Sequence, residues 1–234
     1  MSVFTSFGII VIAMLILGLL QLVPGIFALF YHYALGKFNK AKASDLALFF
    51  ILGTETISVL FFLAVYFIIS IFFLDNSAFE NQPLKWCLFA IFIILSIFCL
   101  CFYYRHGKGS TLFIPRSYPE AVDNYIKTVK NRSGAFLLGI LSCSCELILT
   151  FPLYIIVSIS ILQIENSGLP ANLPTALFVF TPIVPLFSIY FQYYYGYTLA
   201  DIIKKRIKTK PFIRTALGVC YMAIAILIIY TGAI

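Results

Sequence analysis

The chain has 234 residues, of which 62% are hydrophobic and only 11% are charged, and its formal net charge is +7. A soluble domain of this size is about half apolar and about a quarter charged, so the composition excludes an ordinary soluble enzyme. The basic residues lie in short segments between apolar runs, which argues against nucleic-acid binding and for a role in membrane topology.

Six apolar segments predict six transmembrane helices, because a run of about twenty apolar residues crosses the hydrocarbon region and backbone groups there must bond internally. In chain order they are residues 5–35, 46–74, 86–104, 135–162, 175–199 and 212–234. The predicted fold is therefore an all-α polytopic membrane protein with a single transmembrane domain over residues 1–234.

The basic residues predict the orientation. Of the 16 Lys and Arg residues, only Lys85 lies outside segments 36–45, 105–134 and 200–214. Basic loops stay in the cytoplasm, so we expect both termini outside. Within the central segment, Ser117 and Glu120 form a capping-box pattern that opens a short amphipathic helix. We expect this linker helix, ending near residue 129, to lie on the inner leaflet.

The two halves, residues 1–104 and 135–234, are predicted to form inverted repeats. Leu17-Gly18 aligns with Leu138-Gly139, and Pro24-Gly25 then falls opposite Cys145-Glu146. Three spans per half put the halves in opposite orientations. Inverted repeats with helix breaks in matching spans place a binding site at the membrane midplane.

Two glutamates lie alone inside apolar spans: Glu55 in the second and Glu146 in the fourth. A carboxylate at membrane depth costs a few kcal/mol or more and is kept for a partner or a task. Glu55 follows Asp45 by about 15 Å of helix, which places it near the centre of a core about 30 Å thick. Burial disfavours the charged carboxyl, so we expect these side chains to bind a proton or a cation.

Further polar and small residues reach the same depth. Besides the two glutamates, the predicted substrate- or ion-binding residues are Gln21, Gly25, Thr54, Ser142 and Ser188. Small and hydroxyl residues also serve as packing contacts between membrane helices, and this alternative stays open for the serines. The predicted hinges are Pro24, Pro152, Pro182 and Pro185. If a metal is held, Glu55 and Glu146 are the candidate ligands.

One family pattern accompanies these features. Pro24-Gly25 is followed by Ala28-Leu29, then Gly36 and a basic segment, with Gly53 in the second span and Arg214, Gly218 and Gly232 in the sixth. In these residues the chain resembles the lysine-exporter (LysE) superfamily, which includes amino-acid exporters, cation exporters and the thiol-transferring protein CcdA. The resemblance implies an exporter of a small solute. Two features depart from it: Ile26 stands where amino-acid exporters have a second proline, and the first span lacks the cysteine that thiol-transferring members need.

The predicted function is a secondary transporter or exporter of a small polar solute or cation in a bacterial-type cytoplasmic membrane. Its partners would be membrane lipid and the small-molecule or ion substrate, with no nucleic acid; a homodimer stays open. We expect no enzyme activity and no cofactor apart from a coupled proton or cation. One alternative is a CcdA-like thiol–disulfide electron-transfer protein that uses Cys143 or Cys145. Another is a non-transporting partner subunit.

Overall fold

The structure, a computed structural model, describes residues 3–20, 39–72, 82–101, 125, 129–144, 147–196 and 199–230. Within these ranges there are eight helices and no strand, so the all-α prediction is confirmed for them. The helices are α1 (Val3–Leu20), α3 (Lys40–Phe72), α4 (Gln82–Cys101), α6 (Arg132–Ser144), α7 (Leu147–Asn166), α8 (Asn172–Phe180), α9 (Ile183–Tyr194) and α10 (Leu199–Tyr230).

Several of these helices are long and apolar enough to cross a membrane. Five meet this criterion individually, in α1, α3, α4, α7 and α10. The pair α8 and α9, bent by 43°, raises the number to six if it counts as one span. The chain therefore has the helices of a multi-pass membrane protein, as its composition predicts.

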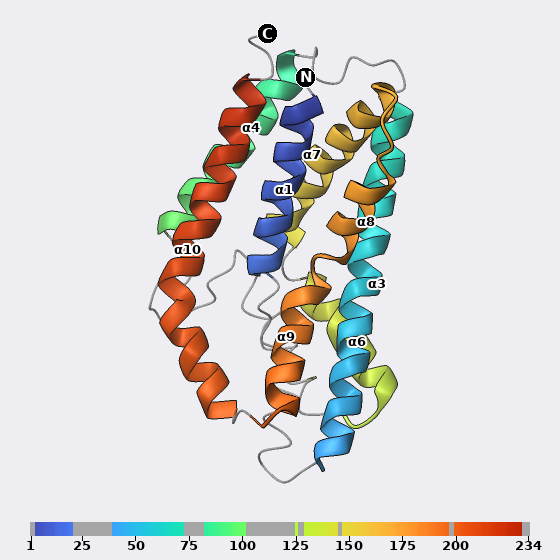
Figure 1. The fold of residues 1–234 in the computed structure, drawn as a ribbon, viewed down its shortest axis with the longest axis vertical. Coiled ribbons are helices and arrows are strands. Elements are labelled where there is room, and N and C mark those ends of the chain that lie inside the picture. Colours follow the sequence, from blue (N-terminus) through green and yellow to red (C-terminus); the bar gives the residue numbers. More distant parts are fainter. Residues whose placement is uncertain are drawn as a thin grey trace.

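The helices run along the long axis of the molecule (Figure 1). α1, α4 and the pair α8–α9 run in one direction, while α3, the pair α6–α7 and α10 run in the other. α4 packs along α10, α1 packs against α7, and α3 packs against both α6 and α7. The start of α1 and the end of α10 therefore lie at the same end of the bundle (Figure 1).

The α3 and α6 helices both begin at the opposite end of the bundle, and an asparagine caps the start of each. The backbone N–H of Lys42 donates to Oδ1 of Asn39 at 2.9 Å, and the backbone N–H of Gly134 donates to Oδ1 of Asn131 at 3.0 Å. An asparagine in this position satisfies one of the backbone donors left free at a helix start. These two caps fix where α3 and α6 begin.

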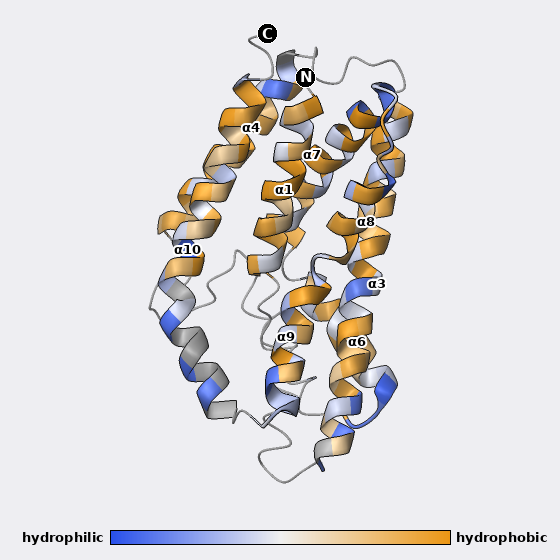
Figure 2. Ribbon diagram, viewed as in Figure 1, coloured by the Kyte–Doolittle hydropathy of each residue, from blue (hydrophilic) through white to orange (hydrophobic). Residues whose placement is uncertain are grey.

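The structure corrects the predicted boundary before the last span. Residues 200–211, expected to form a loop, belong to α10, which begins at Leu199 and continues through Pro211. Lysine, arginine and isoleucine favour or tolerate a helix, and Asp201 in the first turn complements the helix dipole. In Figure 2 the coloured parts of this half of α10 are mostly hydrophilic, in contrast to its hydrophobic second half.

Most of the predicted linker helix lies outside the described residues. Of its last residues, Val129 is buried and Tyr125 packs against the same hydrophobic cluster. These two side chains therefore face the protein rather than a lipid surface.

Two hydrophobic clusters form the core. The large cluster joins α1, α4, α7 and α10, with Phe62 of α3 and Phe178 of α8. The small cluster joins the first third of α3 with α6 and α9. Along α3, the small cluster extends as far as Ile51 and the large cluster starts at Phe62. The turns between these two residues are the part of α3 in which polar side chains are buried.

Candidate functional site

A layer of buried polar and small residues separates the two clusters. On α3 it contains Thr54 and Ser58, and Glu55, whose exposed fraction is 8%. On α6 it contains Gly139 and Ser142, both buried. We call Gly53, Thr54, Glu55, Ser58, Gly139 and Ser142 the polar layer.

Glu55 is the exceptional member of this layer. Both carboxyl oxygens are buried, and neither has a hydrogen-bond partner among the residues that the structure describes. Burying a polar group without a partner is costly, and burying an unpaired charge is far more so. Such a carboxyl is stable when it holds a proton or when a cation accompanies it.

The turn that carries Glu55 is held in place by a close contact between α3 and α6. A side chain added at Gly53 would collide with the carbonyl of Phe136, and one added at Gly139 would collide with the carbonyl of Phe50. The hydroxyl of Thr54 donates to the Phe50 carbonyl at 3.0 Å and lies 3.4 Å from the Gly139 carbonyl. Small residues allow membrane helices to approach this closely.

The packing partner of α3 changes at Glu55. Thr54 contacts Gly139 of α6, whereas Ser58, one turn later, lies 2.9 Å from the hydroxyl of Tyr154 in α7. From Thr54 to Ser58, α3 advances only about 6 Å along its axis. From Gly139 to Tyr154, a straight helix would advance about 22 Å. α6 and α7 thus do not form one straight helix along α3.

A second interruption lies between α8 and α9. These helices meet at Thr181 and Pro182 with a bend of 43°. Proline at this position removes a backbone donor and disturbs the preceding turn. A side chain added at Gly18 of α1 would lie 3.8 Å from Thr181, so α1 passes beside the bend. Figure 1 shows the end of α6, the start of α7 and the α8–α9 bend about half-way along the bundle.

The structure describes four of the predicted binding residues, and three of them lie in the polar layer. Thr54, Glu55 and Ser142 belong to the buried polar layer. Ser188 does not, because it is exposed on α9 and accepts a hydrogen bond from Gln192 at 3.3 Å. Gln21, Pro24, Gly25 and Glu146 lie outside the described residues.

The three described prolines of the predicted hinges also differ. Pro182 is at the bend, whereas Pro185 lies within α9. Pro152 lies inside α7, which continues through it. Because Pro152 lacks an N–H, the helix loses one internal hydrogen bond there. Nearby, the hydroxyl of Tyr221 donates to the carbonyl of Leu149 at 2.9 Å, which ties α10 to this part of α7.

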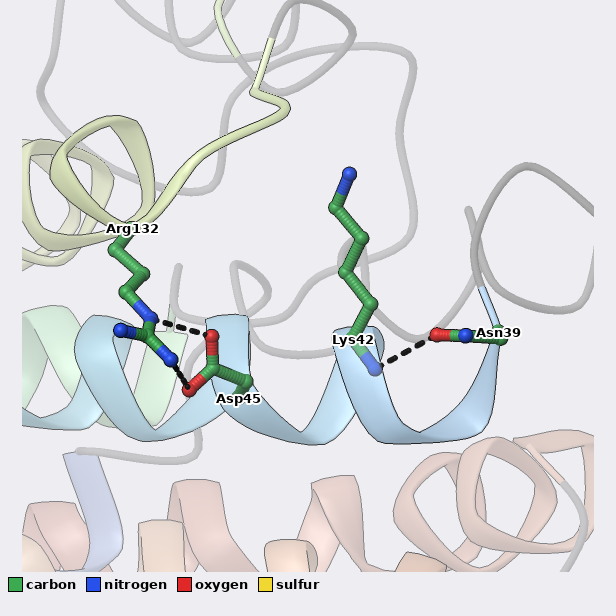
Figure 3. A network of polar contacts seen from close by, with 4 residues as sticks. All are labelled: Asn39, Lys42, Asp45 and Arg132. Atoms are coloured by element: carbon green, nitrogen blue, oxygen red, sulfur yellow. Dashed lines mark hydrogen bonds and ion pairs between the residues drawn. The ribbon is translucent and has the colours of Figure 1, made fainter.

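Sequence reasoning missed the ion pair that joins the starts of α3 and α6. Arg132 at the start of α6 binds Asp45 of α3 through two hydrogen bonds, of 2.7 and 3.1 Å (Figure 3). The guanidinium also lies 5.3 Å from the ring centroid of Phe49. The hydrogen bonds and the charge of Asp45 raise the pKa of Arg132. Nothing in the sequence pairs these two residues, because they belong to different predicted loops.

Within the described part of the chain, no three His, Cys, Asp or Glu residues cluster so that they could hold a metal ion. Of the two predicted glutamate ligands, only Glu55 belongs to the described residues. The chain matches no protein-family model, no curated protein and no solved structure.

Proposed function

We propose that this protein is a secondary transporter, an exporter of a small polar solute or cation, in which Glu55 binds a proton or the cation. The observation that carries the proposal is the burial of both Glu55 carboxyl oxygens without a hydrogen-bond partner in the described structure. An ionisable residue within a membrane span marks a substrate, ion or proton pathway more often than a structural contact.

The helix interruptions support the same proposal. Transporters bind their substrates where spans are broken, since freed backbone groups there add ligands. The α8–α9 bend and the interruption between α6 and α7 are two such breaks. Glu146, between α6 and α7 in sequence, would be the second carboxyl of the site.

Inverted repeats would supply the moving parts. Under this arrangement α1 corresponds to α6, and α4 corresponds to α10. The α4 and α10 helices pack against each other and run in opposite directions (Figure 1). A rocking motion between the two halves, with Pro182 at one hinge, would expose the site to each side in turn.

The thiol alternative has less support. Cys143 is buried on α6, and the described part of the first span contains no cysteine. We therefore favour carboxyl chemistry over thiol exchange, and the resemblance to lysine exporters leaves the solute open. We propose a bacterial-type cytoplasmic membrane with both termini outside.

The decisive experiment is transport by the purified protein in liposomes that contain a pH-sensitive dye. Amino acids, monovalent cations and divalent cations are added in turn, and the solute-dependent proton movement is recorded. We expect one class to raise the rate at least tenfold above that of empty liposomes. Glu55→Gln, Glu146→Gln and the double variant should abolish this movement.

The matched control is Asp201→Asn, which removes an exposed carboxylate on α10 and should transport normally. Full activity of the Glu55→Gln and Glu146→Gln double variant would exclude the carboxyl mechanism. Inactivity of the wild-type protein toward every class would instead favour the non-transporting partner subunit.

A further inference from the structure

Polar groups continue from Glu55 along the contact between α3 and α7. We call this line the α3–α7 seam. It consists of Glu55, Ser58 and Tyr66 on α3 and Tyr154, Ser158 and Glu165 on α7. Residues three, four or seven apart lie on one face of a helix, so each set forms one stripe.

Two hydrogen bonds fix how the stripes face each other. Ser58 and Tyr154 lie 2.9 Å apart through their hydroxyl groups. Farther along, the hydroxyl of Tyr66 donates to Oε2 of Glu165 at 2.8 Å. Ser158 is one turn beyond Tyr154 on the same face of α7, so it lies between these two contacts.

Ser158 has an unusual environment. Its exposed fraction is 0%, and its hydroxyl has no hydrogen-bond partner in the described structure. Ser160, equally buried on the same helix, donates to the carbonyl of Ile156 at 2.8 Å. A hydrogen bond to the carbonyl four residues earlier, as Ser160 makes, is the usual way for a serine to satisfy its hydroxyl within a helix. The seam thus contains two unsatisfied buried groups, Ser158 and Glu55.

Aromatic rings close the seam near Ser158. Phe62, exposed by only 2%, lies between Ser58 and Tyr66 on the same face of α3. Its ring centroid is 5.2 Å from that of Phe178, 6.3 Å from that of Tyr154 and 6.1 Å from that of Tyr66. At the end of the seam Glu165 is exposed. Phe62 therefore separates a buried polar section from one that reaches the surface.

We propose that the α3–α7 seam is the proton route between Glu55 and the surface at Glu165, with Ser158 as a relay and Phe62 as the barrier. The route rests on the proposed function only in taking Glu55 as the proton acceptor. The Glu165 carboxyl releases a proton toward the seam and is recharged from bulk water. Each hydroxyl accepts one proton and passes on its own, so it ends unchanged, and the Glu55 carboxylate becomes neutral.

The spacing suits such a relay. Ser158 is about 6 Å of helix from Tyr154, a gap that one bridging water closes. Buried waters bind where polar groups otherwise lack partners, and Ser158 and Glu55 are such groups. Movement of the Phe62 ring would open the section of the seam between Ser158 and Tyr66.

The test measures deuterium exchange of the Glu55 carboxyl in the reconstituted protein. The infrared band of the protonated carboxyl is assigned by its loss in Glu55→Gln, and its shift is timed after transfer to heavy water. We expect Ser158→Ala to slow exchange at least tenfold and Ser158→Thr, which retains a hydroxyl, to restore it. The matched control Ser160→Ala should exchange at the wild-type rate, and Phe62→Ala should exchange several times faster.

Equal rates in Ser158→Ala and Ser160→Ala would overturn the route, and so would a Phe62→Ala rate no faster than wild type. The absence of a protonated Glu55 band at every pH tested would also overturn it. The two proposals fail separately. Seam-dependent exchange without solute-linked flux leaves the route and rejects transport, whereas Glu55-dependent flux with normal exchange in Ser158→Ala leaves transport and rejects the route.

Discussion

At the scale of single residues, the environments of Thr54 and Glu55 differ sharply although the two are neighbours. The Thr54 hydroxyl donates to a carbonyl of its own helix and lies within reach of one on α6. The Glu55 carboxyl has no partner among the described residues. A satisfied polar group stabilises the fold modestly, whereas an unsatisfied buried one destabilises it. Retention of Glu55 is therefore better explained by function than by stability.

This difference predicts opposite effects of two substitutions on stability. Glu55→Met removes the unsatisfied carboxyl and keeps a side chain of similar length, so it should stabilise the protein by about 1–3 kcal/mol. Thr54→Val removes satisfied hydrogen bonds and should destabilise it by about 1 kcal/mol. Thermal unfolding midpoints in detergent measure both effects. A midpoint of Glu55→Met below that of wild type would mean that the carboxyl has a structural partner.

At the scale of helices, glycines determine which pairs pack closely. Gly53 and Gly139 each contact a backbone carbonyl of the other helix, and Gly218 of α10 contacts Leu100 of α4. The hydroxyl of Ser96 also donates to the Gly218 carbonyl at 2.8 Å. Gly218 thus lies at a close contact between α4 and α10. The α3–α6 contact also positions the polar layer.

Two glycine-to-alanine substitutions test this role. Gly139→Ala places a methyl group against the Phe50 carbonyl and should destabilise the protein by about 1–3 kcal/mol, as overpacking does. Gly8→Ala places a methyl group 3.7 Å from Leu227, an ordinary contact. It should be neutral or stabilising by up to about 1 kcal/mol through helix propensity. Thermal unfolding of both variants, compared with wild type, is the measurement, and equal losses would show that the α3–α6 contact is loose.

At the scale of the whole molecule, exposed basic residues lie at one end of the bundle. The starts of α3, α6 and α10 lie there, and exposed Lys42, Arg132, Lys204 and Lys208 belong to them (Figure 2). The start of α1 and the end of α10 lie at the other end (Figure 1). Basic residues are retained on the cytoplasmic side, which supports the proposed orientation.

Reporter fusions in a bacterial host test this orientation. Alkaline phosphatase, active only outside the cytoplasm, should be active when fused after residue 234 and inactive when fused after residue 130. A fluorescent protein that matures in the cytoplasm should give the reverse pattern. Phosphatase activity at residue 130 together with fluorescence at residue 234 would invert the proposed topology.

The sequence by itself determined the helical, multi-pass character of the chain and the isolation of Glu55 within a long apolar helix. Hydropathy and residue spacing are properties of short segments, so they can be read without knowing which helices touch. The same local signals misjudged residues 200–211, where helix propensity extends α10 into a charged segment. They also could not show that Ser188 faces outward, because spacing defines a face without saying what covers it.

Only the tertiary structure decided how the helices register against one another. The pairs Asp45–Arg132 and Ser58–Tyr154 and the reciprocal contacts of Gly53 and Gly139 all join segments far apart in the chain. Such contacts depend on the mutual fit of whole helix surfaces. The lack of a hydrogen-bond partner for Glu55 in the described structure is likewise a property of every helix packed around it.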